Sequence, residues 1–97
     1  MIVATARVVL HLPMSHSLKD KRQVMQSTLN QVRRRFGVSS AEIEEQERWQ
    51  IGVIGLAHVS NSAAHSREVL ETTIDFIAGW KPEGELLEQE IEIIQSL

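Results

Sequence analysis

The spacing of apolar residues changes along the chain between a period of two and a period of three to four. Across residues 2–12 an apolar side chain occupies every second position, which is typical of a strand with one buried face. Pro13 ends this pattern. Within residues 18–36 the apolar positions lie three, four or seven residues apart, so they share one face of a predicted helix. Gly37 is well placed to end that helix in a left-handed conformation.

Two strands are expected next. Residues 38–47 predict a weak, polar strand, with Ala41 and Ile43 facing inward and the glutamates that alternate with them facing outward. Residues 51–60 are apolar on both faces, which is typical of a strand in the centre of a sheet.

The remainder of the chain predicts a second helix and a last strand. Asn61 or Ser62 can cap the helix, and Gly79 is expected to end it. Residues 81–84 have the composition of a turn, and the last strand follows over residues 86–94. The apolar residues that alternate with glutamates in this strand are Leu87, Ile91 and Ile93.

The order strand, helix, strand, strand, helix, strand is the split βαβ pattern, so the fold class is α+β and ferredoxin-like. It predicts a four-stranded antiparallel sheet, βαββαβ, with two helices on one face. Right-handed crossovers place the first and third strands side by side, and we expect these two neighbours to run parallel. The polar second and last strands then form the edges.

The length of 97 residues fits one compact domain, residues 1–97, and the composition excludes several functional classes. The chain has no cysteine, which excludes disulfides, zinc ribbons and thiol nucleophiles. Its apolar runs are far shorter than the ~20 residues that span a bilayer, so we expect no membrane segment. Met1 leads directly into the first strand without the basic and apolar stretches of a signal peptide, which favours a cytoplasmic protein.

Charge is divided unevenly along the chain, although the net charge is only −3. Residues 1–41 carry seven basic side chains and one acidic one, giving +6. Residues 42–97 carry three basic and twelve acidic ones, giving −9. Such a division indicates either a polar partner for one face or a self-complementary oligomer.

The segment His16-Ser17-Leu18-Lys19-Asp20-Lys21-Arg22 closely resembles the His-Ser-Leu-Lys-Glu-Lys-Arg segment of the YlxP-like family of small bacterial proteins. The resemblance extends over nearly the whole chain. It departs from the family pattern at Asp20, where glutamate is usual, and at residues 47–48, where the family often has an aspartate before the tryptophan. Further matching features are the arginine-rich end of the first helix with Phe36, the Val38-Ser39 and Trp49-Gln50 pairs, and residues 55–60.

This resemblance implies a ferredoxin-like fold without an established activity. Members of the family are commonly encoded near translation initiation factor two and ribosome-binding factor A, which implies a role in translation or ribosome assembly. The fold itself does not decide the function, because one fold serves many unrelated activities.

The start of the first helix is the strongest candidate binding site. A helix N-terminus has unpaired N–H groups and a partial positive charge, and Ser17 with Asp20 forms a capping box there. Further cations are unfavourable at such a position unless an anion, such as an RNA phosphate, binds there. The alternative is that Asp20 offsets the charge and that the cations are simply solvated. The candidate residues for binding nucleic acid or another anion, on this helix and a loop expected beside it, are Ser17, Lys19, Lys21, Arg22, Arg33, Arg34 and Asn61.

The sheet is a poor candidate for binding RNA. RNA-recognition motifs stack bases on aromatic side chains of the central strands, but this chain has no tyrosine and both phenylalanines fall in helical stripes. The solvent side of the first helix, in contrast, carries polar side chains from Lys19 to Arg34 that join its two basic ends. We therefore expect any RNA to bind on the helix side.

Catalytic and metal-binding chemistry is weakly represented. Four histidines, His11, His16, His58 and His65, are expected toward one edge of the sheet and are weak candidates for a transition-metal site. No pair has a spacing typical of metal ligands, so no metal and no cofactor is predicted. The chain lacks a nucleophile elbow and a glycine-rich phosphate loop, and the loop after the first strand lacks the arginine that acylphosphatases use. We expect no enzyme activity and no small-molecule substrate.

Two further expectations concern packing. Trp49, between a charged turn and the third strand, is expected to pack over an edge of the core, the alternative being that it stacks on a base. Val3 and Val9 are expected on the open face of the sheet, together with two apolar residues of the third strand, either Ile54 and Leu56 or Val53 and Val59. A homo-oligomer that buries this strip would let Arg7 meet glutamates of the partner, and exposing the strip to water is unfavourable.

These features lead to one functional expectation and one alternative. We expect an accessory protein that binds RNA or ribosomal particles in translation or ribosome assembly through its basic first helix. The alternative is an oligomeric protein-interaction module, without nucleic-acid binding, that docks a protein partner through the same helix.

Overall fold

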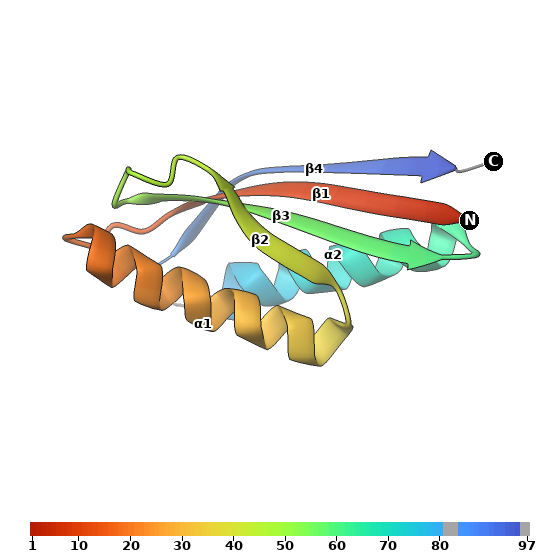
Figure 1. Ribbon diagram of the computed structural model, residues 1–97, viewed down its shortest axis with the longest axis horizontal. Helices are drawn as coiled ribbons and strands as arrows, with labels where there is room; N and C mark the ends of the chain where they lie inside the picture. Colours follow the sequence, from red (N-terminus) through yellow and green to blue (C-terminus); the bar gives the residue numbers. More distant parts are fainter. Residues whose placement is uncertain (81–83, 96–97) are drawn as a thin grey trace.

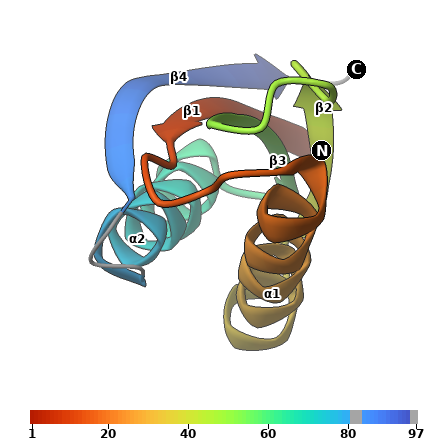
Figure 2. The ribbon, with the colours of Figure 1, turned by 90° about the vertical axis from the view of Figure 1, so that its left-hand side faces the viewer.

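The computed structural model describes residues 1–80 and 84–95 and confirms the predicted order of elements (Figure 1). The strands are β1 (Ile2–His11), β2 (Ser39–Glu44), β3 (Ile51–Ser60) and β4 (Glu85–Gln95), and the helices are α1 (Leu18–Phe36) and α2 (Ala63–Trp80). Both helices lie beneath the same face of one four-stranded antiparallel sheet, as Figures 1 and 2 show. The α+β, ferredoxin-like class is therefore confirmed.

The sheet has the order β2-β3-β1-β4, so the polar strands β2 and β4 form the edges as predicted. β1 runs antiparallel to both β3 and β4, and β2 runs antiparallel to β3. The expectation of a parallel β1–β3 pair is therefore wrong. Each helix joins two parallel strands that are not neighbours, β1 to β2 and β3 to β4, because a strand of the other βαβ unit lies between them.

Antiparallel pairing gives the sheet two distinct ends. His11 pairs with Ile51 where β1 leads into α1, and we call this the α1-start end. Ile2 pairs with Ser60 where β3 leads into α2, and we call this the α2-start end. Residues that follow β1 and residues that follow β3 are therefore separated by the length of the central strands.

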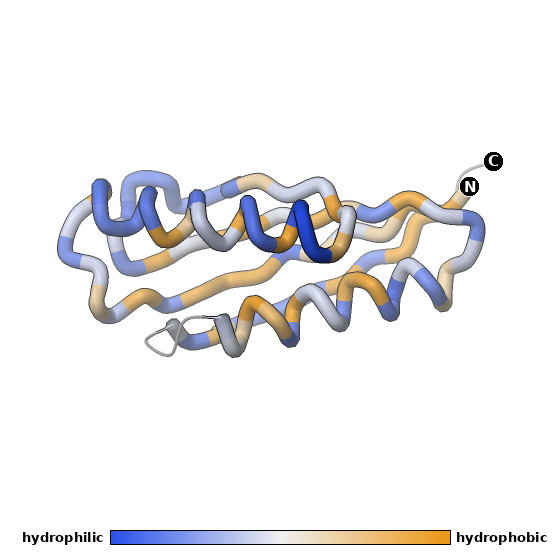
Figure 3. The backbone as a smooth tube through the Cα atoms, turned by 90° about the horizontal axis from the view of Figure 1, so that it is seen from below, coloured by the Kyte–Doolittle hydropathy of each residue, from blue (hydrophilic) through white to orange (hydrophobic). Residues whose placement is uncertain are grey.

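The core lies between the helices and one face of the sheet. Its sheet residues are Ala4, Ala6, Val8, Leu10, Ile54 and Leu56, and its helix residues are Met25, Leu29, Val32, Leu70, Ile74 and Ile77. The predicted helical periods are thus confirmed, because each helix buries one stripe and leaves the other side in solvent. Seen from the helix side, α1 carries the more hydrophilic positions and α2 more of the apolar ones (Figure 3).

β2 presents the opposite face from the one predicted. Glu42 is half-buried, whereas Ala41 and Ile43 are exposed and Ile43 lies over Gly55 of β3 on the open face. A Cβ atom built at Gly55 would lie 2.8 Å from the Ile43 Cγ2 atom, so a side chain at position 55 would require Ile43 to shift. The register of β2 against β3 shifts between Glu42 and Glu44. This bulge leaves Ile43 without a partner in the ladder, which alternation along the sequence cannot reveal.

A second bulge, in the pairing of β1 with β4, changes which residues of β4 face the core. Its register against β1 shifts between Val9 and Leu10, which places Leu86 opposite Leu10. Leu86 packs against the core and Leu87 is 51% exposed, so the predicted inward position of Leu87 is wrong. Ile91 and Ile93 pack against the core as predicted.

Local signals fix both ends of α1. The Ser17 Oγ atom accepts a hydrogen bond from the Asp20 backbone N–H at 3.0 Å, and Asp20 Oδ2 accepts one from the His16 backbone N–H at 3.0 Å. Gly37 adopts the left-handed conformation, with φ of 64°. The predicted start and stop signals are confirmed, because each depends only on residues within one helical turn.

The ends of α2 follow the sequence less closely. Ser62 caps the helix, because its Oγ atom accepts a hydrogen bond from the His65 backbone N–H at 3.2 Å. The helix continues through Gly79 to Trp80, so the predicted end at Gly79 is wrong. The predicted turn at residues 81–84 lies outside the described residues except for Gly84.

One cation crosses the open face of the sheet. Arg7 of β1 donates from Nε to Glu44 at 2.7 Å and from Nη1 to Glu88 at 3.2 Å, so its guanidinium joins the two edge strands, β2 and β4, across the central strands β3 and β1. The hydrogen bond between Arg7 and Glu44 raises the pKa of the guanidinium and lowers the pKa of the carboxyl. Val9 and Val53 on the same face are buried. Both carboxylates that Arg7 meets here belong to its own chain.

Besides Ile43, exposed apolar side chains on this face lie toward the α2-start end. Val3 pairs with Val59 on one side and with Ile94 on the other. Val59 is 59% exposed and Ile94 is 46% exposed. We call these three residues the open-face apolar cluster. It is shorter than the expected strip, because Val9 and Val53 are shielded from solvent.

Candidate functional site

Lys21 departs most from the predicted set of anion-binding residues. Its side chain is 1% exposed, and its Nζ atom lies 2.8 Å from Glu42 Oε2. The same ammonium donates hydrogen bonds to the backbone carbonyls of Glu45 and Arg48. Two of its N–H groups thus donate to these carbonyls, and the carboxylate of Glu42 balances its charge. Lys21 is therefore not available to an external anion and instead joins α1 to β2 and to the connection that follows β2.

Three of the predicted cations, Lys19, Arg22 and Arg34, are exposed, and no carboxylate in the described part of the chain forms an ion pair with them. Arg33 is also exposed and donates from Nη2 to the carbonyl of Ser40 at 2.7 Å. This bond fixes the direction of its guanidinium without neutralising its charge. All four cations can therefore reach an anion from solvent.

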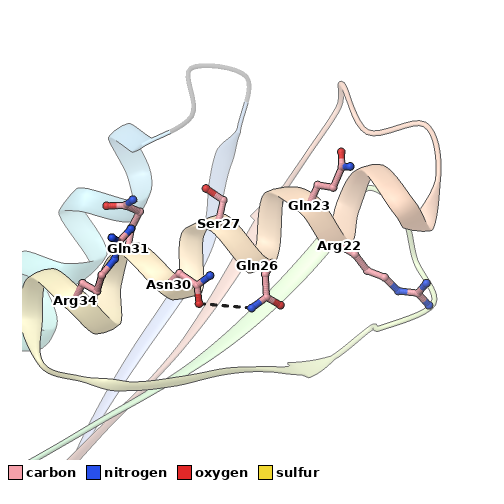
Figure 4. A pocket seen from close by; sticks show the side chains of 7 residues that line it. All are labelled: Arg22, Gln23, Gln26, Ser27, Asn30, Gln31 and Arg34. Carbon is pink, nitrogen blue, oxygen red and sulfur yellow. Dashed lines mark hydrogen bonds between the residues drawn. The ribbon is translucent and has the colours of Figure 1, made fainter.

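The exposed side of α1 is a polar row with an arginine at each end, shown in Figure 4. Arg22 and Arg34 stand twelve residues apart, which is about 18 Å along an α-helix. Between them lie amide and hydroxyl side chains, which can both donate and accept hydrogen bonds. The row lines a shallow hollow of about 600 Å³. We call it the α1 outer face, and its residues are Arg22, Gln23, Gln26, Ser27, Asn30, Gln31 and Arg34.

After the first turn of α1, the sequence contains no carboxylate as far as the first residues of β2. Residues 21–41 contain no aspartate and no glutamate. The exposed side of α2, in contrast, carries Glu68, Glu71 and Asp75, and the exposed positions of β4 carry several glutamates. Positive potential is therefore concentrated on α1, where it attracts anions over about a Debye length, roughly 8–10 Å at moderate salt.

Arg35, next to this row, has a different role. Its Nε atom donates to Gln31 Oε1 at 3.1 Å, and its guanidinium lies 4.8 Å from the centre of the Phe76 ring. The cation thus covers an aromatic side chain of α2. This contact explains Arg35 as part of the packing between the helices.

The structure does not bring Asn61 to the start of α1. Asn61 follows Ser60 at the α2-start end, whereas Ser17 caps α1 at the α1-start end. The expectation that Asn61 adds a hydrogen bond to the same site is therefore wrong, since it assumed that β1 and β3 run in the same direction. Ser17 itself is half-buried, and its Oγ atom is used as the helix cap.

The four histidines are divided between the two ends of the sheet. His11 and His16 lie at the α1-start end, and His58 and His65 lie at the α2-start end. The His58 Nδ1 atom is 2.9 Å from the Oγ atom of Ser66, and the His58 and His65 rings pack edge to face with 5.5 Å between centroids. The expectation of one shared edge is wrong, again because the central strands are antiparallel.

Two of these histidine rings have polar partners. Ser66 is fully buried, and its Oγ atom also lies 2.6 Å from Ser60 Oγ, so it is not exposed to a substrate. The His11 Nδ1 atom has one carboxylate neighbour, Glu85 Oε2 at 3.6 Å. Across residues 1–80 and 84–95, no three histidine, aspartate or glutamate side chains gather where they could share a metal ion.

The connection between β2 and β3, residues 45–50, was not predicted as part of the site. Trp49 in this connection is 52% exposed, so the expectation that it packs over the core is wrong. The connection lies against the start of α1, because Lys21 donates to the carbonyls of Glu45 and Arg48. One feature of the sequence could have indicated an exposed Trp49. It stands in a polar segment, and no apolar residues at strand or helix spacing accompany it.

Comparisons with known proteins agree with this fold. Foldit4, a de novo designed protein, has a similar structure, with a TM-score of 0.56 and 12% sequence identity over the full length of both chains. A likeness at this identity concerns the fold alone. Neither helix, within the residues that the structure describes, is long and apolar enough to span a bilayer.

Sequence relatives define the family. A Bacillus subtilis (strain 168) protein, "Uncharacterized protein YlxP", is 39% identical to this chain over 61 residues. That match spans 63% of this chain and 66% of the relative, slightly less than two thirds of its length. The family model "Protein of unknown function (DUF503)" matches residues 3–91, which include both helices, all of β2 and β3, and most of β1 and β4. The chain therefore belongs to the DUF503 family, as its resemblance to YlxP-like proteins indicated.

Proposed function

We propose that this protein is a non-enzymatic cytoplasmic accessory protein that associates with RNA or ribosomal particles, in translation or ribosome assembly, through α1. One observation carries the proposal. Lys19, Arg22, Arg33 and Arg34 are exposed on a helix whose sequence contains no carboxylate after Asp20, and none of the four has a carboxylate partner among the described residues. A surface of unpaired cations and neutral amides is suited to a chain of phosphates.

The other faces of the molecule support this choice of surface. The open sheet face carries one arginine, Arg7, whose charge is matched by Glu44 and Glu88. Among the exposed charged side chains of α2, three are carboxylates and one is an arginine. A polyanion is therefore attracted to α1 and repelled by most of the remaining surface.

Contacts from this surface would give affinity and position without base specificity. Lysine and arginine that meet phosphates bind different sequences equally and release counterions, so affinity falls as salt rises. The amides of the α1 outer face add donors and acceptors that can meet sugar hydroxyls between the phosphates. We therefore expect binding that depends strongly on salt and weakly on RNA sequence.

The test compares the native protein with a triple variant, Lys19→Glu, Arg22→Glu and Arg34→Glu, which leaves the buried Lys21 and the bonded Arg33 in place. Affinity for a short RNA and for purified ribosomal subunits is measured over a range of salt concentrations. Losing three phosphate contacts should lower the slope of log affinity against log salt by about 2–3 and weaken binding at least tenfold.

Arg67→Glu is the matched control, because Arg67 is an exposed helical cation on α2. It should leave the affinity and the salt slope close to native, and all variants should keep native circular dichroism. Absence of binding by the native protein, or equal binding by the triple variant, would contradict the proposal.

A second candidate function is favoured by the open-face apolar cluster. Val3, Val59 and Ile94 form a contiguous apolar surface on neighbouring strands, and two of them are about half exposed. Association of two copies through this face would remove it from water. In this alternative the protein is an oligomeric interaction module, and its molecular mass in solution rises with concentration whether RNA is present or not.

A further inference from the structure

Several anchors hold the β2–β3 connection against the α1-start end. The buried ammonium of Lys21 bonds two of its carbonyls. At its far end, Gln50 donates from Nε2 to the carbonyls of Pro13 and Ser15, at 3.2 Å each, and accepts a hydrogen bond from the Leu12 backbone N–H at 2.8 Å. The connection is therefore fixed to both the first turns of α1 and the loop before it.

The first residue of this connection is held in an unfavourable conformation. Glu45 has φ of 56°, and it is the one residue other than glycine with positive φ in the part of the chain that the structure describes. A side chain makes this region costly, so it persists where surrounding contacts determine it. Here the contact is the hydrogen bond from Lys21 to the Glu45 carbonyl. Such strain is found where a loop must present its residues in one arrangement.

Trp49 is the aromatic residue that the anchored connection exposes to solvent. Its neighbours Arg48 and Gln50 are each bonded through their backbone carbonyls, whereas half of Trp49 remains exposed to solvent. A tryptophan held in this way loses little further conformational entropy when a ligand covers it. A contribution of Trp49 to the core does not account for these anchors, because the residue lies outside the core.

The surroundings of Trp49 have the chemistry of a base-binding surface. A shallow hollow of about 390 Å³ is lined by Trp49 with Glu47, Arg48, Gln50 and Ile51. It combines an aromatic plane, a guanidinium and an amide. Every base offers a face that stacks on an indole, together with edge groups that bond amides and guanidiniums.

The charges around the β2–β3 connection favour a phosphate near α1 over one near Glu47. Glu45 is paired with Arg48, whose Nη1 atom is 3.2 Å from Glu45 Oε2, while Glu47 has no cationic partner among the described residues. On α1, Arg22 follows Lys21, the residue that bonds the connection, and begins the α1 outer face in Figure 4. A neutral base can therefore occupy the Trp49 side while its phosphates lie toward Lys19 and Arg22.

From this arrangement we infer that Trp49 stacks on an unpaired base of a single-stranded RNA segment whose phosphates follow the α1 outer face. The inference rests on the proposed function and specifies its ligand. Paired bases within a duplex have no free face for the indole, so the Trp49 contact is made only with single strands or loops. Trp49 thus distinguishes single-stranded from double-stranded RNA, while the cations of α1 bind both.

The experiment measures the affinity of native protein, Trp49→Ala and Trp49→Phe for a short oligoadenylate and for a duplex RNA of the same length. Loss of one stacked base should weaken single-strand binding about 5- to 100-fold in Trp49→Ala and leave duplex binding unchanged. Trp49→Phe retains an aromatic ring, so its affinity for oligoadenylate should remain within a few-fold of that of the native protein. Leu87→Ala is the control, because Leu87 on β4 is as exposed as Trp49 and belongs neither to the β2–β3 connection, nor to α1, nor to the open-face apolar cluster.

Fluorescence gives a second measure on the same site. In the Trp80→Phe variant, Trp49 is the one remaining tryptophan. Its emission should be quenched when oligoadenylate saturates the protein, and duplex RNA should quench it less. Thermal unfolding of Trp49→Ala should be close to native, which separates lost binding from lost folding.

The outcomes separate this inference from the proposed function. If native protein binds RNA with the expected salt dependence but Trp49→Ala binds oligoadenylate equally well, the stacking inference is overturned and the proposed function stands. Unquenched Trp49 emission at saturation overturns it in the same way. If native protein binds neither RNA, the proposed function fails and the inference fails with it.

Discussion

The two strand-to-helix junctions of this fold are built alike but stabilised by different chemistry. Each helix begins at a capping serine, Ser17 or Ser62, and each carries a buried polar residue four positions later, Lys21 or Ser66. At the α1-start end that residue is a cation with three partners. At the α2-start end it is a hydroxyl bonded to His58 and Ser60.

The range of these contacts differs as much as their charge. The partners of Ser66 lie six and eight residues earlier in the chain, so they stabilise the junction itself. The carbonyl partners of Lys21 lie 24 and 27 residues later, in a connection that joins two other strands. The α2 junction is therefore a local structure, whereas the α1 junction fixes a distant, exposed segment beside the basic helix.

The largest effect is expected at Lys21. Lys21→Met leaves Glu42 without its ion-pair partner and two carbonyls without their donor, so the free energy of unfolding should fall by about 3 kcal/mol. Urea denaturation followed by circular dichroism measures this change. Lys19→Met, two residues away and exposed, should change stability by no more than about 0.5 kcal/mol.

A second substitution tests whether the loss in Lys21→Met comes from the unpaired carboxylate of Glu42. Adding Glu42→Gln to Lys21→Met should recover part of the loss, because it removes the uncompensated carboxylate. Equal stability of Lys21→Met and the native protein would show that the ammonium does not hold the β2–β3 connection.

A smaller effect is expected at the equivalent position of α2. Ser66→Ala removes the hydroxyl that His58 Nδ1 and Ser60 Oγ share, and this should reduce the free energy of unfolding by about 1–2 kcal/mol. The same denaturation experiment applies, with the exposed Ser39→Ala as control. A loss as large as that of Lys21→Met would remove the energetic difference between the two junctions.

The smallest effect on stability is expected at Val59, where the α2-start end exposes apolar surface. Val59→Lys should change the free energy of unfolding by no more than about 0.5 kcal/mol, because the side chain already faces solvent. If copies associate through the open-face apolar cluster, light scattering will show a mass above 11.0 kDa for native protein at high micromolar concentration and a monomer for the variant. A native protein that stays monomeric under these conditions would exclude that interface.

The sequence predicted those features that depend on nearby residues. The order of elements, both caps of α1 and the core stripes of the helices follow from periodicity and from signals within one turn. The basic exposed side of α1 follows from the same helical period. The predicted fold was therefore correct in class and in strand order.

Features that depend on distant contacts were not predicted. Burial of Lys21 requires Glu42 and two carbonyls from another part of the chain, and no local pattern of a lysine on a helix indicates this. The same contact turns Glu42 inward and so reverses the predicted face of β2. The positions of Asn61 and the histidines depend on the direction of β3 relative to β1. Because the two strands were expected to be parallel, the residues after β3 were predicted at the α1-start end, whereas they lie at the α2-start end.

The contact between Ile43 and Gly55 has a consequence for how this sequence can change during evolution. The bulge of β2 places the Ile43 side chain so close to Gly55 that a Cβ atom at position 55 would displace it. A larger residue at position 55 is therefore accommodated more easily when the residue at position 43 is smaller. Among related proteins we expect these two positions, one on an edge strand and one on a central strand, to vary together, so that each can be interpreted only with the other.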